Sequence, residues 1–150
     1  MLRYKLTHPQ ILAALGTAGH GSQVLIADGN YPFTTGSNPA AVHVFLNLAR
    51  GFAAVDEVLA VLVDAIPIEA AQVMMPASGV EAPIFASFRQ VLPASVSLQP
   101  LERFAFYDAA RSTNVALVIA TGEQRIYANI LLTIGVVPPD SYRCSDKDSG

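Results

Sequence analysis

Residues 18–32 read AGHGSQVLIADGNYP, so that a glycine turn, an apolar run and a polar loop follow one another. The apolar run at 23–28 is short and suits a β conformation, which predicts a buried strand. His20 precedes this strand and Asp28 ends it. The glycines on both sides of His20 permit positive φ angles and the close approach of a ligand. Because ligands of open α/β sheets bind beyond the carboxyl ends of strands, we expect Asp28 at a binding site, together with His20.

Strands and helices alternate along the rest of the chain, which predicts a single α/β domain with a mainly parallel central sheet and helices on both faces. The domain is expected to cover residues 1–139, and the polar residues 140–150 are expected to form a flexible tail. The first helix should begin at Thr7, whose spacing to Gln10 matches a capping box. Strands are expected at 23–28, 42–46, 70–75, 95–101, 115–120 and 126–134, and helices at 7–16, 53–65, 83–91 and 104–111.

The amino-acid composition limits the kinds of partner that this chain is expected to bind. The chain is 52% apolar and 14% charged, and a charged fraction below the usual quarter favours a homo-oligomer that buries further surface. The net charge is −3 and the lysines and arginines are scattered, so no nucleic acid is expected as a partner. No apolar run reaches the roughly 18 residues of a membrane span. The N-terminal residues lack an apolar leader and Cys144 is the only cysteine, which together predict a cytoplasmic protein.

Motifs of several common chemistries are missing. The sequence has no G-x-S-x-G elbow, no phosphate-binding G-x-x-x-x-G-K, no G-x-G-x-x-G and no paired cysteines. The three histidines, His8, His20 and His43, do not have the spacing of a zinc site. We therefore expect neither a metal ion nor an organic cofactor.

Four separated motifs give the chain a family resemblance. The first is GHG at 19–21 with Asp28 and the Tyr-Pro pair at 31–32. ERFAFY at 102–107, TGE at 121–123 and YANILL at 127–132 follow in order. Together they resemble the signature of the RbsD/FucU family of sugar mutarotases, closest to its L-fucose mutarotase branch. The resemblance covers nearly the whole domain and implies the RbsD-like fold.

The resemblance also implies roles for individual residues. The proton-transfer histidine of the family falls on His20, and its sugar-binding aspartate falls on Asp28. Arg103 resembles the fucose branch, because the ribose branch has a histidine at this position. The Tyr-x-Asn pair that contacts the sugar falls on Tyr127 and Asn129. The implied catalytic residues are His20, Asp28 and Tyr127, and the implied substrate-binding residues are Asp28, Arg103, Tyr127, Asn129, Asp64 and Tyr107.

Two departures from the family pattern are Asn30 and the tail from Asp140, which has no counterpart in the family. Asn30 stands where members of the fucose branch often have histidine, which leaves the preferred sugar open. The region after Asp64 carries extra residues. The family also forms ring-shaped assemblies, often decamers, which implies a ring-shaped homo-oligomer here. In such an assembly we expect Tyr107 to be donated to the pocket by a neighbouring subunit.

The residue types agree with mutarotation, which needs one acid and one base but no cofactor. Histidine titrates near neutrality and can fill either role. Aspartate, asparagine, tyrosine and arginine supply donors and acceptors for sugar hydroxyls. Three alternatives remain: a non-catalytic sugar-binding accessory protein of a transport or catabolic system, a D-ribose pyranase-type activity, and a structural or interaction protein. A titratable proton carrier such as His20 is unnecessary for binding alone, which favours the enzyme.

Overall fold

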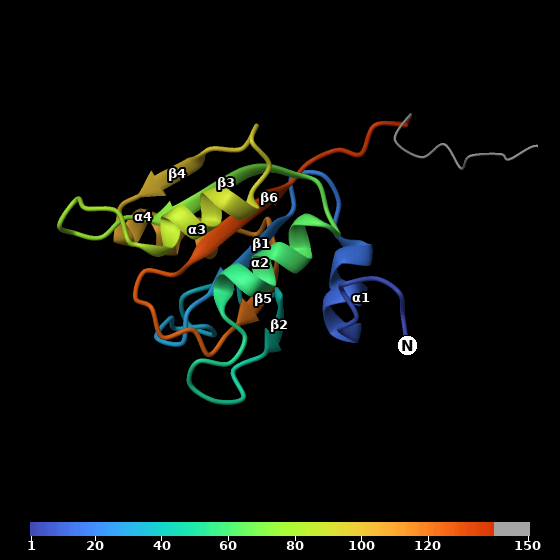
Figure 1. The fold of residues 1–150 in the computed structure, drawn as a ribbon, viewed down its shortest axis with the longest axis horizontal. Helices are drawn as coiled ribbons and strands as arrows, with labels where there is room; N and C mark the ends of the chain where they lie inside the picture. The colour runs from blue at the N-terminus through green and yellow to red at the C-terminus, as the bar shows by residue number, and fades with distance from the viewer. Residues whose placement is uncertain (140–150) are drawn as a thin grey trace, which may run out of the picture.

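The computed structural model describes residues 1–139, which form a six-stranded sheet with helices packed on it (Figure 1). The tail expected at 140–150 lies outside the described residues. The strands are β1 (Gln23–Ala27), β2 (Val42–Phe45), β3 (Ile68–Met74), β4 (Leu98–Leu101), β5 (Val115–Ala120) and β6 (Ile130–Ile134). The helices are α1 (Pro9–Thr17), α2 (Val55–Val63), α3 (Ile84–Val91) and α4 (Arg103–Ala110).

The strands lie in the order β2-β5-β1-β6-β3-β4. β2 and β5, β5 and β1, and β3 and β4 pair in parallel, whereas β6 runs antiparallel to both β1 and β3. The predicted α/β class with a mainly parallel sheet is confirmed, and β6 is the exception. Residues 121–129, between β5 and β6, contain no helix. A parallel return needs a longer crossover, so this short connection brings β6 back in the opposite direction.

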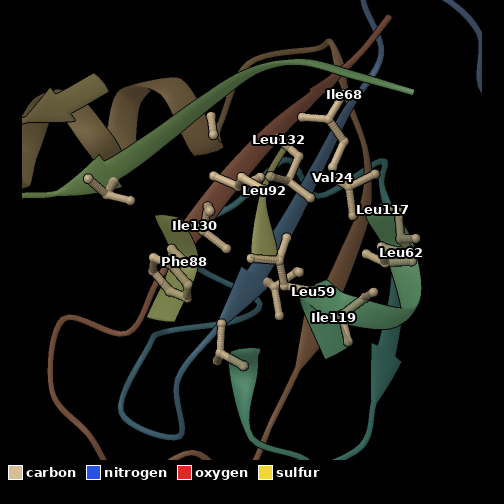
Figure 2. Packing of buried hydrophobic residues seen from close by; sticks show 14 of the residues in the cluster. Val24, Leu59, Leu62, Ile68, Phe88, Leu92, Leu117, Ile119, Ile130 and Leu132 are labelled. Atoms are coloured by element: carbon tan, nitrogen blue, oxygen red, sulfur yellow. The ribbon is translucent and has the colours of Figure 1, made fainter. Parts of the chain in front are cut away.

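Both faces of the sheet are covered, but unequally. α1, α2 and α3 pack on one face, where they form the larger core with alternate residues of β1 such as Val24 and Ile26. Figure 2 shows Val24 in this core together with Leu59 and Phe88. Leu25 points to the other face, which is covered by α4 and the loop after β1. Each fully buried aliphatic side chain contributes about 1.5–3 kcal/mol to the stability of the fold. Burial on both faces explains why the sequence of β1 is continuously apolar.

The start of α1 differs from the expectation. His8, not Thr7, is the N-cap, because its Nδ1 accepts a hydrogen bond from the Ile11 N–H at 3.4 Å. Pro9 explains the shift, since a residue before proline is driven into the extended conformation that a cap adopts, and His8 has φ −68° and ψ 119°. Within residues 1–139, no helix has both the length and the apolar character needed to cross a membrane.

Candidate active site

A cavity of about 360 Å³, lined by both polar and apolar side chains, opens beyond the carboxyl end of β1. Five residues expected at the site from the sequence share it. These are Asp28, Arg103, Tyr107, Tyr127 and Asn129. The antiparallel direction of β6 explains the convergence, because it places the residues that precede β6 beside the residue that follows β1. The remaining lining residues are Asn30, Tyr31, Met74 and Ile126.

Asp28 connects the chain segments that line the cavity through the hydrogen bonds that it accepts. Its side chain is buried, at 3% exposure, and its carboxylate accepts three hydrogen bonds. Oδ1 accepts from the Asn30 N–H at 2.9 Å, and Oδ2 accepts from the Ala128 N–H at 3.2 Å and from Asn129 Nδ2 at 3.1 Å. Asn129 Oδ1 in turn accepts from the Asp28 N–H at 2.8 Å. Burial raises the pKa of Asp28, and these hydrogen bonds oppose the rise.

Tyr127 occupies an unusual backbone conformation. Its φ is +60°, in the left-handed region that costs a residue with a side chain about 1–3 kcal/mol. The two residues that follow it, Ala128 and Asn129, are both bound to Asp28. Asp28 therefore holds Tyr127 in this conformation. The strand expected from 126 to 134 begins only at Ile130, because the residues before it line the cavity or bind Asp28 and do not pair with a neighbouring strand.

Arg103 is the first residue of α4 and is exposed. The Glu102 carboxylate caps this helix by accepting from the N–H groups of Phe104 and Ala105. The guanidinium carbon of Arg103 lies 5.8 Å from the ring centres of both Phe104 and Tyr107. The N–H donors of the Arg103 guanidinium are therefore available at the rim of the cavity.

Tyr107 was expected to come from a neighbouring subunit, but it already lines the cavity of its own chain. Its ring lies 5.5 Å from that of Tyr31, and the guanidinium of Arg111 lies 5.7 Å from its centre. Tyr31 is buried and its hydroxyl donates to the Gly36 carbonyl at 2.7 Å. Burial raises the pKa of Tyr31, so its hydroxyl stays protonated near neutral pH.

His20 lies at the other end of β1. The sequence suggested that His20 and Asp28 share one site, but an extended strand separates the ends it joins, and five strand residues span about 16 Å. His20 Nε2 lies instead 2.9 Å from Glu69 Oε2. Glu69 belongs to β3 and was not expected from the sequence. The only signal for it is a lone carboxylate in an otherwise largely apolar strand.

Asp64 does not line the cavity either. It follows the last turn of α2 and forms an ion pair with Lys5. Both side chains are largely exposed, at 48% and 73%, as is usual for a surface ion pair. Within one chain, Asp64 therefore belongs to a different part of the surface.

Glu123 fixes the loop between β5 and β6, which leads to the cavity. Its buried carboxylate accepts from the Val55 N–H at 3.2 Å and from Arg125, whose guanidinium also bonds Asp56 of α2. Burial works to raise the pKa of Glu123, but the hydrogen bonds from Arg125 outweigh it and lower the pKa to about 2. The loop that leads to Tyr127 is thereby clamped to the start of α2.

The titratable side chains of residues 1–139 include no group of three or more histidine, cysteine, aspartate or glutamate residues that could hold a metal ion. The cavity is instead lined by hydrogen-bonding groups of both kinds. Asp28 offers acceptors, Arg103 offers donors, and Asn129 and the tyrosines offer both. This mixture suits a small polyhydroxylated molecule.

Comparison with known proteins decides the family. The RbsD / FucU transport protein family matches residues 1–137. The chain belongs to this family. The fucose mutarotase of Danio rerio is 31% identical over 144 residues, which cover 88% of this chain and 90% of the relative. The D-ribose pyranase of Paracidovorax citrulli is 29% identical over 139 residues, covering 91% and 98%.

A solved member of the RbsD / FucU family extends the comparison to three dimensions. The crystal structure of the fucose mutarotase from Streptococcus pneumoniae in complex with L-fucose has a TM-score of 0.75 with this chain at 25% identity. The match covers 92% of this chain and 100% of that one. The resemblance inferred from the four sequence motifs is thus confirmed.

Proposed function

We propose that this chain is an isomerase, a mutarotase that interconverts the anomers of a free monosaccharide, with L-fucose or a sugar of related stereochemistry as substrate. The observation that carries the proposal is the convergence of Asp28, Arg103 and Tyr127 on one cavity. Similarity to the fucose mutarotase of Danio rerio supports it.

The free hydrogen-bonding capacity of the cavity matches a sugar. The Asp28 carboxyl group lines the cavity, and its oxygens are acceptors that can bind a sugar hydroxyl beside the hydrogen bonds that they accept from the protein. Arg103 supplies donors from the rim, and Tyr107 and Tyr127 add aromatic faces against which the C–H groups of a pyranose can pack. A polar site of this kind selects among sugars, because a misplaced hydroxyl leaves its groups unpaired.

The reaction opens and recloses a hemiacetal. A base removes the proton of the anomeric hydroxyl, an acid gives a proton to the ring oxygen, and the bond between the anomeric carbon and the ring oxygen breaks. The product is the open-chain aldehyde with a free hydroxyl. After rotation about the neighbouring carbon–carbon bond, that hydroxyl attacks the other face of the aldehyde. The two proton transfers then run in reverse, so that acid and base are regenerated.

We propose that His20 is the proton carrier and that it enters the cavity of a neighbouring chain. The Asp28 cavity and His20 lie at opposite ends of the same strand, so one chain cannot bring them together. Apolar side chains exposed on and after β2 support self-association, among them Phe45, Leu48 and Phe52 at 56%, 85% and 58% exposure. The assembly is a closed ring-shaped homo-oligomer such as a decamer, in which each site is shared.

Saturation-transfer NMR tests the activity directly. Purified protein should accelerate exchange between the anomers of L-fucose above the rate measured in buffer alone. Calorimetry on the same samples measures binding. Binding without accelerated exchange of any sugar would support the non-catalytic accessory protein and contradict the mutarotase.

Mixing two inactive variants tests the shared site. His20→Ala and Tyr127→Phe chains, dissociated and reassembled together, should regain about a quarter of the wild-type exchange rate, because about a quarter of the mixed sites combine an intact His20 from one chain with an intact Tyr127 from the other. Each variant reassembled alone is the control and stays inactive. Failure of the mixture to regain activity would contradict the shared site.

A D-ribose pyranase-type activity is the second candidate, because the Paracidovorax citrulli pyranase is nearly as similar to this chain as the fucose relatives are. Exchange rates for D-ribose and L-fucose decide between them. We also propose a cytoplasmic location, since the chain has a single cysteine and therefore no internal disulfide.

A further inference from the structure

Glu69 is the partner of His20. The two side chains come from different elements, the turn before β1 and the strand β3, and their Nε2 and Oε2 atoms lie 2.9 Å apart. Both are partly exposed, at 58% for His20 and 45% for Glu69. The rest of the imidazole ring is therefore accessible from solvent, while its Nε2 atom contacts Glu69.

A bulge in β3 presents Glu69 to the histidine. Ile68 lies opposite Ile134 of β6 and Ala70 lies opposite Thr133, so Glu69 is an extra residue without a partner in the ladder. Bulges of this kind redirect a side chain and are frequent beside active sites. Regular pairing would have kept Glu69 in the alternation of the strand, so the irregularity sets the direction of its carboxylate.

The end of β6 leaves room for this carboxylate. Gly135 has no side chain, and a Cβ atom there would lie 3.3 Å from Glu69 Cβ and 3.6 Å from Glu69 Oε2. The same end of β6 anchors the histidine turn: the Gly21 N–H donates to the Ile134 carbonyl at 2.9 Å, and the Ile134 N–H donates to the Ser22 carbonyl at 2.9 Å. The histidine turn is thus fixed to Ile134, and Glu69 lies against the next residue, Gly135.

We propose that Glu69 is the positioning residue of the proton carrier: it holds the imidazole of His20 as the Nε2–H tautomer and so makes Nδ1 the atom that exchanges protons with the sugar. The proposal rests on the mutarotase function proposed above. An ionised carboxylate can only accept hydrogen bonds, so the nitrogen facing it must carry the hydrogen. The other nitrogen then has the lone pair.

The proton balance follows from this tautomer. Nδ1 takes the proton of the anomeric hydroxyl while the ring oxygen receives one from a second group, and the imidazolium that forms lies against the carboxylate of Glu69. When the ring recloses, the attacking hydroxyl returns its proton to the second group, and Nδ1 returns its proton to the aldehyde oxygen. Glu69 itself gains and loses no proton, and it does not touch the sugar.

Two substitutions separate positioning from structure. Glu69→Ala should lower kcat for L-fucose exchange roughly tenfold, the rate equivalent of one charge-assisted hydrogen bond at an exposed site, with KM unchanged because the sugar contacts remain. Glu69→Gln keeps an oxygen that accepts from Nε2–H and should restore part of kcat. Glu81→Ala is the matched control, since it removes another half-exposed glutamate that pairs with a cation, Arg89.

¹⁵N NMR of the histidine side chains, recorded without sugar, reports the tautomer directly. His20 should be an Nε2–H tautomer in the wild type and a mixture of tautomers in Glu69→Ala. Equal kcat in wild type and Glu69→Ala, or an Nδ1–H tautomer in the wild type, would overturn the proposal while leaving the mutarotase function intact. Absence of accelerated exchange in the wild type would overturn the function and the role of Glu69 with it.

Discussion

The two ends of β1 hold their polar side chains in opposite ways. At the carboxyl end, Asp28 is buried and accepts three hydrogen bonds that fix two backbone segments. At the amino end, His20 is half exposed, and its Nε2 lies 2.9 Å from Glu69 Oε2. The Asp28 cavity is thus part of the folded structure, whereas the proposed proton carrier lies on the surface. Substitutions at the two ends should therefore affect different quantities.

The largest effect is expected at the exposed end. His20→Ala should lower the sugar exchange rate by about 10²–10⁴-fold, the usual contribution of a proton-transfer group, while the free energy of unfolding barely changes. His20→Gln should behave alike, because glutamine keeps hydrogen bonding but does not titrate. NMR exchange rates and urea denaturation measure the two quantities. Full activity of either variant would move the chemistry to Asp28 or Tyr127.

The reverse pattern is expected at the buried end. Asp28→Ala leaves the Ala128 N–H and the Asn129 amide without their acceptor, so the free energy of unfolding should fall by about 2–4 kcal/mol. The left-handed conformation of Tyr127 should be lost with it, and exchange should fall as well. Urea denaturation gives the loss of stability. An unchanged midpoint would show that the cavity wall does not depend on Asp28.

Glu123, in the loop between β5 and β6, allows the stability of the fold near this end of β1 to be followed by pH. Its folded pKa of about 2 lies below the ordinary 4.5, so its stabilisation is complete above about pH 4.5 and is lost as the pH falls towards 2. Glu123→Gln should cost about 2–3 kcal/mol at pH 7 and much less at pH 2. Thermal unfolding across this range checks the prediction, with Glu57→Gln as an exposed control in the same neighbourhood. Equal losses at both pH values would contradict it.

The smallest expected effect is on the choice of sugar. Arg103→His should lower the preference for L-fucose over D-ribose by roughly tenfold, because an imidazole cannot reach the same hydroxyls as a long guanidinium. Exchange rates for L-fucose, D-ribose, L-rhamnose and D-galactose in both proteins test this. An unchanged ranking, or a wild type that already prefers ribose, would show that Arg103 does not set the specificity.

Most of the fold could be predicted because its signals are local. The apolar run of β1, the β-branched run of β5 and the amphipathic pattern of α2 appear at the expected positions. The direction of β6 could not be predicted, since an apolar strand reads the same in both directions and only its neighbours decide. The cap of α1 was misplaced because the restriction that Pro9 puts on His8 outweighed the spacing of Thr7 and Gln10.

The candidate site also contains residues that the sequence could identify and residues that it could not. Asp28, Arg103 and Tyr127 lie in motifs and meet in one cavity, as the resemblance implies. The separation of His20 from Asp28 follows from the length of an extended strand and could have been anticipated from the five residues between 23 and 27. The contact of Glu69 with His20 could not have been anticipated, because the direction of the Glu69 side chain depends on a bulge in the pairing of β3 with β6 that no local pattern reveals.

The aromatic lining of the cavity also gives the protein a built-in optical probe. The chain has five tyrosines and no tryptophan, and three of the tyrosines, Tyr31, Tyr107 and Tyr127, line the cavity. Ultraviolet emission excited in the tyrosine absorption band therefore comes from phenol rings alone, and most of those rings line the cavity proposed to bind the sugar. A ligand that enters should change the intensity of this emission without any attached label, so occupancy can be titrated in the unmodified chain.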